Sequence, residues 1–323
     1  MNNLIDRRGA LVRLAAVSAA ALSPSALLGC SPASPASRAA RSSDSDGNGQ
    51  GGANEALRWK HFPAGENGFF RAPVLLTGQK EAVLIDGGFT LADGRAVSEA
   101  IAASGKTLTT IYVSQSDPDY YFGLAPIKAA SPDARVIAAP ATVAAIRASM
   151  GKKLEIWGPK LGANGPRTEA DLVIPEADTA RSITLEGETL EIVDAEGLAN
   201  RRYVWSPSLR AVFGGVLVFS GLHVWTADTA KPEQRAAWMK NLDAMAARKP
   251  KTVVPGHMAV GAVLDASAIE YTKAYLVAFE EELARAVDGT ALIAAMKRRY
   301  PDAGMSVALE VGAKVAKGEM KWG

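Results

Sequence analysis

The sequence predicts an α/β (α+β) protein, a sandwich of two β-sheets with helices on both outer faces. Short β-rich runs alternate with Ala-rich helical runs from about residue 58 to the end. These runs fall into two sets, each rich in strands and closed by helices. Because sheets and amphipathic helices must each bury an apolar face, this order favours two packed sheets covered by helices. The chain of 323 residues, 48% of them hydrophobic, is long enough to bury such a core.

The first set of elements begins with a hairpin. Two apolar runs are separated by Gly78 and Gln79, and the second run ends in Asp86-Gly87-Gly88. Apolar periodicity then predicts strands at 72–77, 82–85, 109–113 and 135–138, with helices at 94–104, 123–130 and 140–150.

The second set contains more strands and ends in helices. We expect strands near 172–174, 182–185, 189–193, 203–206, 211–213 and 252–254, with helices at 232–248, 266–288 and 290–299. Tyr271, Tyr275, Ala278, Phe279 and Leu283 follow helical spacing, which indicates a packing face for these appended C-terminal helices.

Residues 1–29 are predicted to be a signal peptide. A basic start precedes an apolar run that ends in Leu27-Leu28-Gly29-Cys30 and resembles the lipobox of bacterial lipoproteins. Cleavage before Cys30 and its lipidation are therefore expected. A transmembrane anchor is the alternative, but Ser23-Pro24-Ser25 shortens the apolar run below the roughly 20 residues of a membrane span.

The signal and the segment after it predict export to the cell envelope. Arg7-Arg8-Gly9-Ala10-Leu11 resembles a twin-arginine signal, although a generic basic start fits equally well, so the export route stays open. Residues 30–57 combine the lipidated cysteine with a Ser-, Ala- and Gly-rich flexible tether, and the folded domain occupies 58–323. By analogy with lipoproteins, Ser31 favours an outer-membrane anchor facing the periplasm.

Charge and cysteine content exclude several kinds of partner and site. Residues 30–323 carry 33 basic and 33 acidic side chains, because cleavage of the signal peptide would remove Arg7, Arg8, Arg13 and Asp6. Without a basic stripe, nucleic acid is not an expected partner. A small-molecule substrate or ligand fits better, and no feature identifies a protein partner. The single cysteine, Cys30, excludes a disulfide framework and a cysteine-built zinc site.

Residues 111–123 are the most informative segment for chemistry. A buried strand runs into a polar turn that holds Asp117 and Asp119, and a Gly-initiated helix follows. In layered α/β folds, the carboxyl ends of strands line the ligand crevice. The alternative is that the two carboxylates only cap the next helix.

This segment resembles the first metal motif of the metallo-β-lactamase superfamily, His-x-His-x-Asp-His followed by Gly, and reads Gln115-x-Asp117-x-Asp119-Tyr120. Three further landmarks follow the family's order. Residues 83–88 resemble its early strand and Asp-Gly turn, residues 213–219 resemble its Gly-Asp segment, and Val254-Pro255-Gly256-His257 resembles its last ligand turn. Over residues 59–258, the resemblance implies an αββα sandwich of two mixed sheets.

The departures from the family motif change the expected chemistry. Gln115, Asp117 and Tyr120 replace histidines, Val216 replaces the bridging Asp, and Glu196 or Asp194 stands near the middle-chain histidine. The remaining candidate ligands are Gln115, Asp117, Asp119, Glu196 and His257. This oxygen-rich set suits Mn²⁺, Mg²⁺ or Ca²⁺ at least as well as Zn²⁺, with Asp119 as ligand or general base, and the absence of any metal is left open.

Other residues could line a pocket. Tyr120, His223 and Trp225 lie in predicted loops near strand ends, although core packing explains each of them as well. His257 could likewise serve only to bind a neighbouring strand. Two functions follow: a hydrolase-like envelope enzyme with an altered, mononuclear metal site, or a metal-free pseudoenzyme that binds a ligand or a protein.

Overall fold

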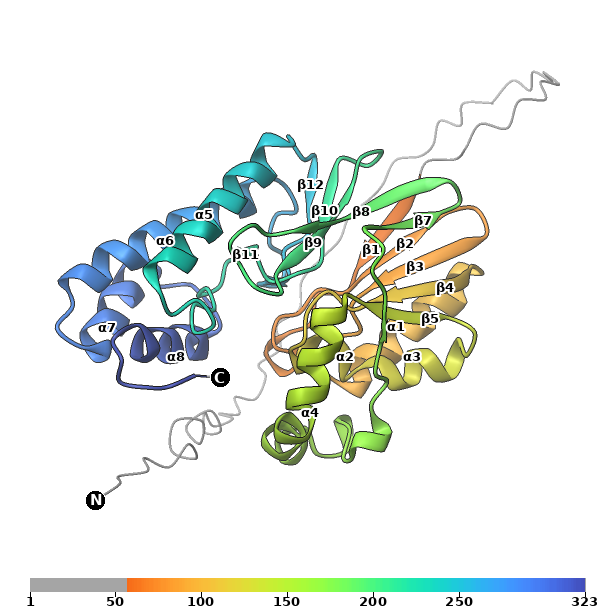
Figure 1. Cartoon of the computed structure of the whole chain (residues 1–323), viewed down its shortest axis with the longest axis horizontal. Helices are drawn as coiled ribbons and strands as arrows, with labels where there is room; N and C mark the ends of the chain where they lie inside the picture. Colours follow the sequence, from red (N-terminus) through yellow and green to blue (C-terminus); the bar gives the residue numbers. More distant parts are fainter. Residues whose placement is uncertain (1–56, 323) are drawn as a thin grey trace, which may run out of the picture. The chain divides into compact units, whose positions relative to one another are not determined.

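The computed structural model describes residues 57–322, which lie within one compact unit spanning Ala53–Gly323 (Figure 1). The predicted signal peptide, Cys30 and nearly all of the tether lie outside the described residues. The described part contains a six-stranded sheet, a five-stranded sheet and a two-stranded ribbon, flanked by helices. This arrangement confirms the predicted α/β sandwich.

The first sheet combines an antiparallel meander with parallel strands. Strands β1, β2 and β3 pair antiparallel, and β3, β4, β5 and β6 pair parallel in chain order. Parallel neighbours need a crossover, and helices or long connections supply it here. The strands are β1 (Arg58–His61), β2 (Val74–Thr77), β3 (Glu81–Ile85), β4 (Thr107–Tyr112), β5 (Arg135–Ala138) and β6 (Glu176–Ala177).

The second sheet has the order β12-β10-β9-β8-β7, in which only β10 and β12 pair in parallel. A short ribbon of β11 and β13 lies outside it. The strands are β7 (Ser182–Leu185), β8 (Glu188–Asp194), β9 (Arg202–Ser206), β10 (Ala211–Phe213), β11 (Phe219–Ser220), β12 (Thr252–Val253) and β13 (His257–Met258).

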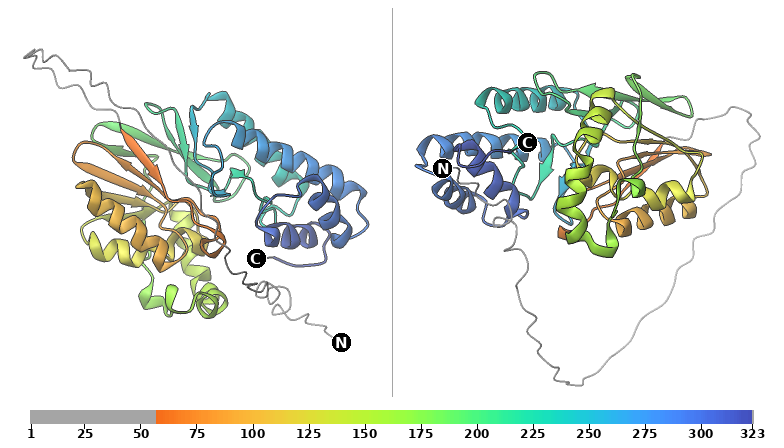
Figure 2. Two further views of the ribbon diagram at one scale, coloured as in Figure 1. Left: turned by 180° about the vertical axis from the view of Figure 1, so that it is seen from behind. Right: turned by 60° about the horizontal axis from the view of Figure 1, so that its bottom comes forward.

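Helices lie on the outer side of each sheet, and the last helices of the chain pack on one another beside the sandwich (Figures 1 and 2). Thr90 begins α1 with a reciprocal capping box to Asp93, which satisfies free N–H groups of the first turn. The helices are α1 (Leu91–Ser104), α2 (Pro118–Tyr121), α3 (Leu124–Ala130), α4 (Pro140–Leu161), α5 (Pro232–Ala247), α6 (Ser267–Arg285), α7 (Gly289–Arg299) and α8 (Ser306–Ala316). Within residues 57–322, no helix is both long and apolar enough to cross a membrane.

Successive side chains on β2 and β3 belong alternately to two hydrophobic core clusters. Leu75 and Leu84 join the cluster that includes the buried faces of α1 and α3. Leu76 and Ile85 join a second cluster, together with residues of β7 to β10 such as Phe213. Because successive strand residues point to opposite faces, each strand can serve both layers.

The structure differs from the predicted elements at several places. The predicted strand at 172–174 is a loop whose apolar side chains pack on the core, and the strand pairing occurs only at β6. Helix α4 continues to Leu161, beyond the predicted end at residue 150. Helix α8 was not predicted; its buried residues include Leu309 and Ala313.

Candidate functional site

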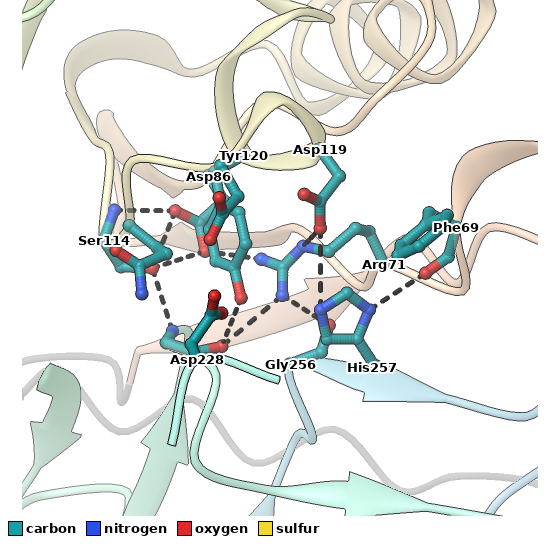
Figure 3. Close-up of polar contacts among 12 residues, drawn as sticks. Phe69, Arg71, Asp86, Ser114, Asp119, Tyr120, Asp228, Gly256 and His257 are labelled. Carbon is teal, nitrogen blue, oxygen red and sulfur yellow. Dashed lines mark hydrogen bonds and ion pairs between the residues drawn. The ribbon is translucent and has the colours of Figure 1, made fainter. Parts of the chain in front are cut away.

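A cluster of buried polar side chains lies where loops that follow or precede several strands meet (Figure 3). Arg71 lies between β1 and β2, Asp86 follows β3, Asp119 and Tyr120 belong to α2, and His257 begins β13. Each is at most 6% exposed. Of the predicted site residues, the structure therefore brings together Asp119, Tyr120 and His257, and it adds Arg71 and Asp86.

Arg71 is the centre of this cluster. An isolated antiparallel bridge between Arg71 and His257 places its loop beside β13. Its guanidinium donates from Nη2 to Oδ2 of Asp86 at 2.7 Å, and from Nη1 to the carbonyl oxygen of Gly256 at 2.5 Å. The Gly215 carbonyl oxygen lies 3.4 Å from the same Nη1, and Cζ lies 3.6 Å from the ring centre of Tyr120. The cation is thus surrounded by oxygen atoms and one aromatic face.

Asp86 is fixed by the same network. Ser114 donates to its carboxylate from both the backbone N–H and the hydroxyl group, over 2.8 to 2.9 Å. The Ser114 hydroxyl oxygen also accepts from the N–H of Gly215 at 2.9 Å, which links the first sheet to the loop after β10. Burial raises the pKa of Asp86, although Arg71 and Ser114 act in the opposite direction. Both oxygens of the Asp86 carboxylate therefore accept hydrogen bonds, which offsets part of the cost of burying the pair.

Asp119 and His257 form a second pair in contact with Arg71. Oδ2 of Asp119 lies 3.6 Å from Nε of Arg71 and 3.5 Å from Nε2 of His257. Burial raises the pKa of Asp119 to about 7, and it lowers the pKa of His257 well below its usual value. Neither Oδ2 of Asp119 nor Nε of Arg71 has a hydrogen-bond partner.

The carbonyl oxygen of Phe69 sets the tautomer of His257. It lies 2.9 Å from Nδ1, and since a carbonyl oxygen only accepts, Nδ1 carries the proton. Nε2 of the neutral ring is then an acceptor that faces Asp119. Burial is the largest cause of the raised pKa of Asp119, and the positive charge of Arg71 acts in the opposite direction.

The other predicted ligands bind residues outside this centre. Asp117 is 39% exposed at its side chain and pairs with Nζ of Lys153 at 3.1 Å. It precedes α2 without a side-chain capping bond, so the capping alternative is not realised there. Gln115 accepts hydrogen bonds from Ser116 and Asn200, through its side-chain oxygen.

Glu196 and His223 contact residues that do not belong to the central cluster. The exposed Glu196 is held through its backbone N–H and carbonyl group by the amide of Asn241. The Nδ1 atom of His223 lies 3.0 Å from the hydroxyl oxygen of Tyr275, and burial lowers the pKa of His223 to about 4. These contacts match the packing alternative for His223.

The donors present do not fit a metal ion. Within residues 57–322, no three His, Cys, Asp or Glu side chains gather in a way that could hold one. The position of the family's bridging Asp is the buried apolar Val216. Arg71 already places a positive charge against Asp86 and Asp119, which would repel a divalent cation at short range. The predicted set of Gln115, Asp117, Asp119, Glu196 and His257 is therefore not assembled as a ligand shell.

Aromatic rings surround the outer side of His257. Phe69 makes edge-on contacts with His257, Trp157 and Trp225, at 5.8 to 6.1 Å between ring centres. Trp225, a predicted pocket residue, also contacts Trp322. Two surface hollows of about 610 and 630 Å³ lie elsewhere, beside α3 and between α6 and α7.

Sequence reasoning did not identify Arg71. The residue stands between Phe70 and the apolar run that leads into β2, where a charged side chain must find a partner. That signal could have marked Arg71 as buried and paired. It could not have named Asp86 as the partner, since nothing in the sequence shows which loops meet.

Comparisons with known proteins agree with the fold. The family model described as the metallo-beta-lactamase superfamily matches residues 67–257. A search of curated proteins finds no match. Among solved structures, a beta-lactamase domain protein from Burkholderia ambifaria is 17% identical with a TM-score of 0.56, covering 81% of this chain and 84% of its own.

A metallo-beta-lactamase family protein from Thermus thermophilus is 18% identical with a TM-score of 0.53, covering 79% of this chain and 91% of its own. At these identities, the two structures support the fold alone. The family model spans more than half of the chain. The chain therefore belongs to the metallo-beta-lactamase superfamily.

Proposed function

We propose that this chain is a metal-independent, non-hydrolytic member of its superfamily that acts as a ligand-binding protein of the cell envelope. Arg71 carries the proposal, because its guanidinium lies among the residues that stand at the family's ligand positions. It contacts Asp119 and Tyr120 of the first motif, and the carbonyl oxygens of Gly215 and Gly256, which directly precede Val216 and His257.

A guanidinium can supply a positive charge but not the chemistry of a metal. It holds carboxylates in a fixed planar geometry, and it stays protonated at any physiological pH. It has no open coordination position at which a water molecule could become acidic, as it does on a bound metal ion. The centre is therefore suited to holding the loops in place. It offers no metal-bound water molecule as the nucleophile for the hydrolysis that the family resemblance implies.

The N-terminal sequence supports an envelope location. A signal peptide at 1–29, lipidation at Cys30 and a tether up to residue 57 would hold the domain at the periplasmic side of the outer membrane. Incorporation of radiolabelled palmitate tests this part of the proposal. Label in the wild-type chain and its loss in Cys30→Ala are expected, whereas equal label in both would contradict the anchor.

Metal analysis tests the centre. The chain from residue 31 onward is purified without chelator, incubated with Zn²⁺ or Mn²⁺, freed of unbound ions and measured for metal content. We expect far less than one equivalent, and no difference between the wild-type chain, Asp119→Ala and His257→Ala. A stoichiometric metal that both substitutions remove would overturn the proposal.

Activity assays test the absence of hydrolysis. Lactam, lactone, thioester and phosphodiester substrates are offered with each metal present. The wild-type chain and Asp119→Ala should give the same background rate. Turnover that depends on Asp119 or His257 would show an enzyme.

A further inference from the structure

The segment after α8 folds back onto the site's outer side. The N–H groups of Glu319 and Met320 donate to the carbonyl oxygen of Lys314, and the Glu319 carboxylate accepts from the N–H of Gly289. Trp322 then lies against Trp225, with ring centres 5.3 Å apart and ring planes at 67°. Figure 1 shows this segment leaving the helices toward the strands.

A fixed carboxylate receives the indole of Trp322. Nε1 of Trp322 donates to Oδ1 of Asp228 at 2.7 Å. The other oxygen of Asp228 accepts from Nη2 of Arg201 at 2.9 Å, and the Arg201 side chain is only 12% exposed. Arg201 therefore holds Asp228 so that Oδ1 presents an acceptor beside the ring of Trp225.

Trp322 is held loosely compared with the rings beneath it. Trp322 is 45% exposed, and its ring makes one hydrogen bond and one edge-to-face contact. Beneath it, Trp225 contacts Phe69, and Phe69 contacts His257. Removal of Trp322 would uncover the outermost ring of a row that leads inward to His257.

We propose that Trp225, Asp228 and Arg201 form a recognition site for a small aromatic ligand that carries an N–H donor, and that Trp322 occupies this site as an internal competitor. The ring packs against Trp225, and the N–H donates to Asp228. The ligand class is that of indole, because the chain itself places an indole there. This inference rests on the proposed ligand-binding role and specifies its ligand.

The experiment titrates 5-fluoroindole into the chain from residue 31 onward and follows binding by fluorine NMR. Trp322→Ala should bind the probe about tenfold more tightly than the wild-type chain, because the internal competitor is gone. Adding Asp228→Ala to Trp322→Ala should abolish this gain. Trp322→Phe, which keeps a ring without the N–H, should give an intermediate affinity.

Two controls separate recognition from simple filling of a vacated space. Fluoronaphthalene has a similar ring without an N–H, so it should bind Trp322→Ala more weakly than 5-fluoroindole does. Trp59→Ala removes a half-buried tryptophan that contacts Phe213, and it should create no site for either probe. Circular dichroism and thermal unfolding confirm that each variant is folded.

Three results would overturn the inference: equal affinity of the wild-type chain and Trp322→Ala, equal affinity for the two probes, or binding that survives the loss of Asp228. The titration contains no metal and measures no turnover. A metal found in the centre would therefore end the proposed function while leaving this site intact, and failure of the titration would leave the metal-independent centre intact.

Discussion

Nη2 of Arg71 and Oδ2 of Asp86 lie 2.7 Å apart, and both side chains are shielded from solvent. Each charge in such a pair depends on the other, because a single buried charge would remain far from water without compensation. Removal of one partner should therefore lower the stability of the chain much more than replacement of both partners by neutral side chains.

Arg71→Met should destabilise the chain strongly. It leaves Asp86 buried without its cation, and removal of one partner from a buried pair typically costs about 3 to 5 kcal/mol. Urea unfolding of the chain from residue 31 onward measures the loss. Arg71→Met combined with Asp86→Asn should lose less than Arg71→Met alone.

Arg135→Met is the matched control for Arg71→Met. Arg135 pairs with Asp178, and its side chain is 62% exposed. The loss of an exposed pair changes stability by no more than about 1 kcal/mol. If the two arginine variants unfolded at the same urea concentration, Arg71 would not have the central role described above.

Asp119→Asn should change how stability depends on pH. Burial raises the pKa of Asp119 from 3.8 to about 7, so between these values the folded chain holds a proton that the unfolded chain has released. The stabilisation this provides is complete below pH 3.8 and is lost as the pH rises through about 7. Asn stays neutral, so wild type should lose about 2 to 3 kcal/mol relative to Asp119→Asn between pH 5 and pH 8.

Parallel urea titrations at several pH values measure this difference. Asp117→Asn is the control, since Asp117 is partly exposed and paired with Lys153. It should change the pH profile much less. Identical pH profiles for wild type and Asp119→Asn would mean that Asp119 is ionised throughout this range.

His223→Gln should flatten the acid side of the stability profile. Burial lowers the pKa of His223 from 6.5 to about 4, so at intermediate pH the unfolded chain binds a proton that the folded chain does not. The stabilisation is complete above pH 6.5 and declines as the pH falls toward 4. His223 should account for about 2 to 3 kcal/mol of this decline.

Thermal or urea unfolding between pH 7 and pH 4 tests the effect of His223. His61→Gln is a suitable comparison because His61 is less buried. The slope should change clearly in His223→Gln and little in His61→Gln. The same slope in wild type and His223→Gln would show that His223 is protonated in the folded chain.

Gly94→Ala should destabilise the chain although it places Ala in a helix. A Cβ atom on Gly94 would lie 1.9 Å from the carbonyl oxygen of Gly123, so α1 and α3 would have to separate. Alanine normally stabilises a helix interior by about 1 kcal/mol relative to glycine. The contact should reverse this sign, and the unfolding free energy measures it.

Gly151→Ala is the matched helical control. Its Cβ would meet only an oxygen of the flexible Glu169 side chain, so the helix preference should prevail and α4 should be slightly stabilised. Opposite signs for Gly94→Ala and Gly151→Ala are expected. Stabilisation by both substitutions would show that α1 and α3 can separate at little cost.

The fold could be predicted because its main signals are local. The hairpin before Asp86 and the strand before Ser114 show the apolar runs that buried strands require, and both are present. Helix α8 could not be assigned as readily. Val307, Leu309 and Val311 alternate as in a strand, whereas in the structure α8 packs against α7.

The candidate site could be predicted only in part. Asp119 and His257 belong to recognisable motifs, and the structure places them 3.5 Å apart. Arg71 belongs to no motif, and its place beside His257 depends on a bridge between distant parts of the chain. The sequence left Glu196 and Asp194 as alternatives because no motif fixes the alignment there; the structure places Glu196 in the loop between β8 and β9 and Asp194 at the end of β8.

The positive charge at the centre of the site is attached to the polypeptide. A bound metal ion can be removed by dialysis or by a chelator. The guanidinium of Arg71, which binds Asp86, is covalently part of the chain. Under the proposed function, assembly of the centre needs no metal-loading step. On that proposal, removal of transition metals leaves the fold of the chain unchanged.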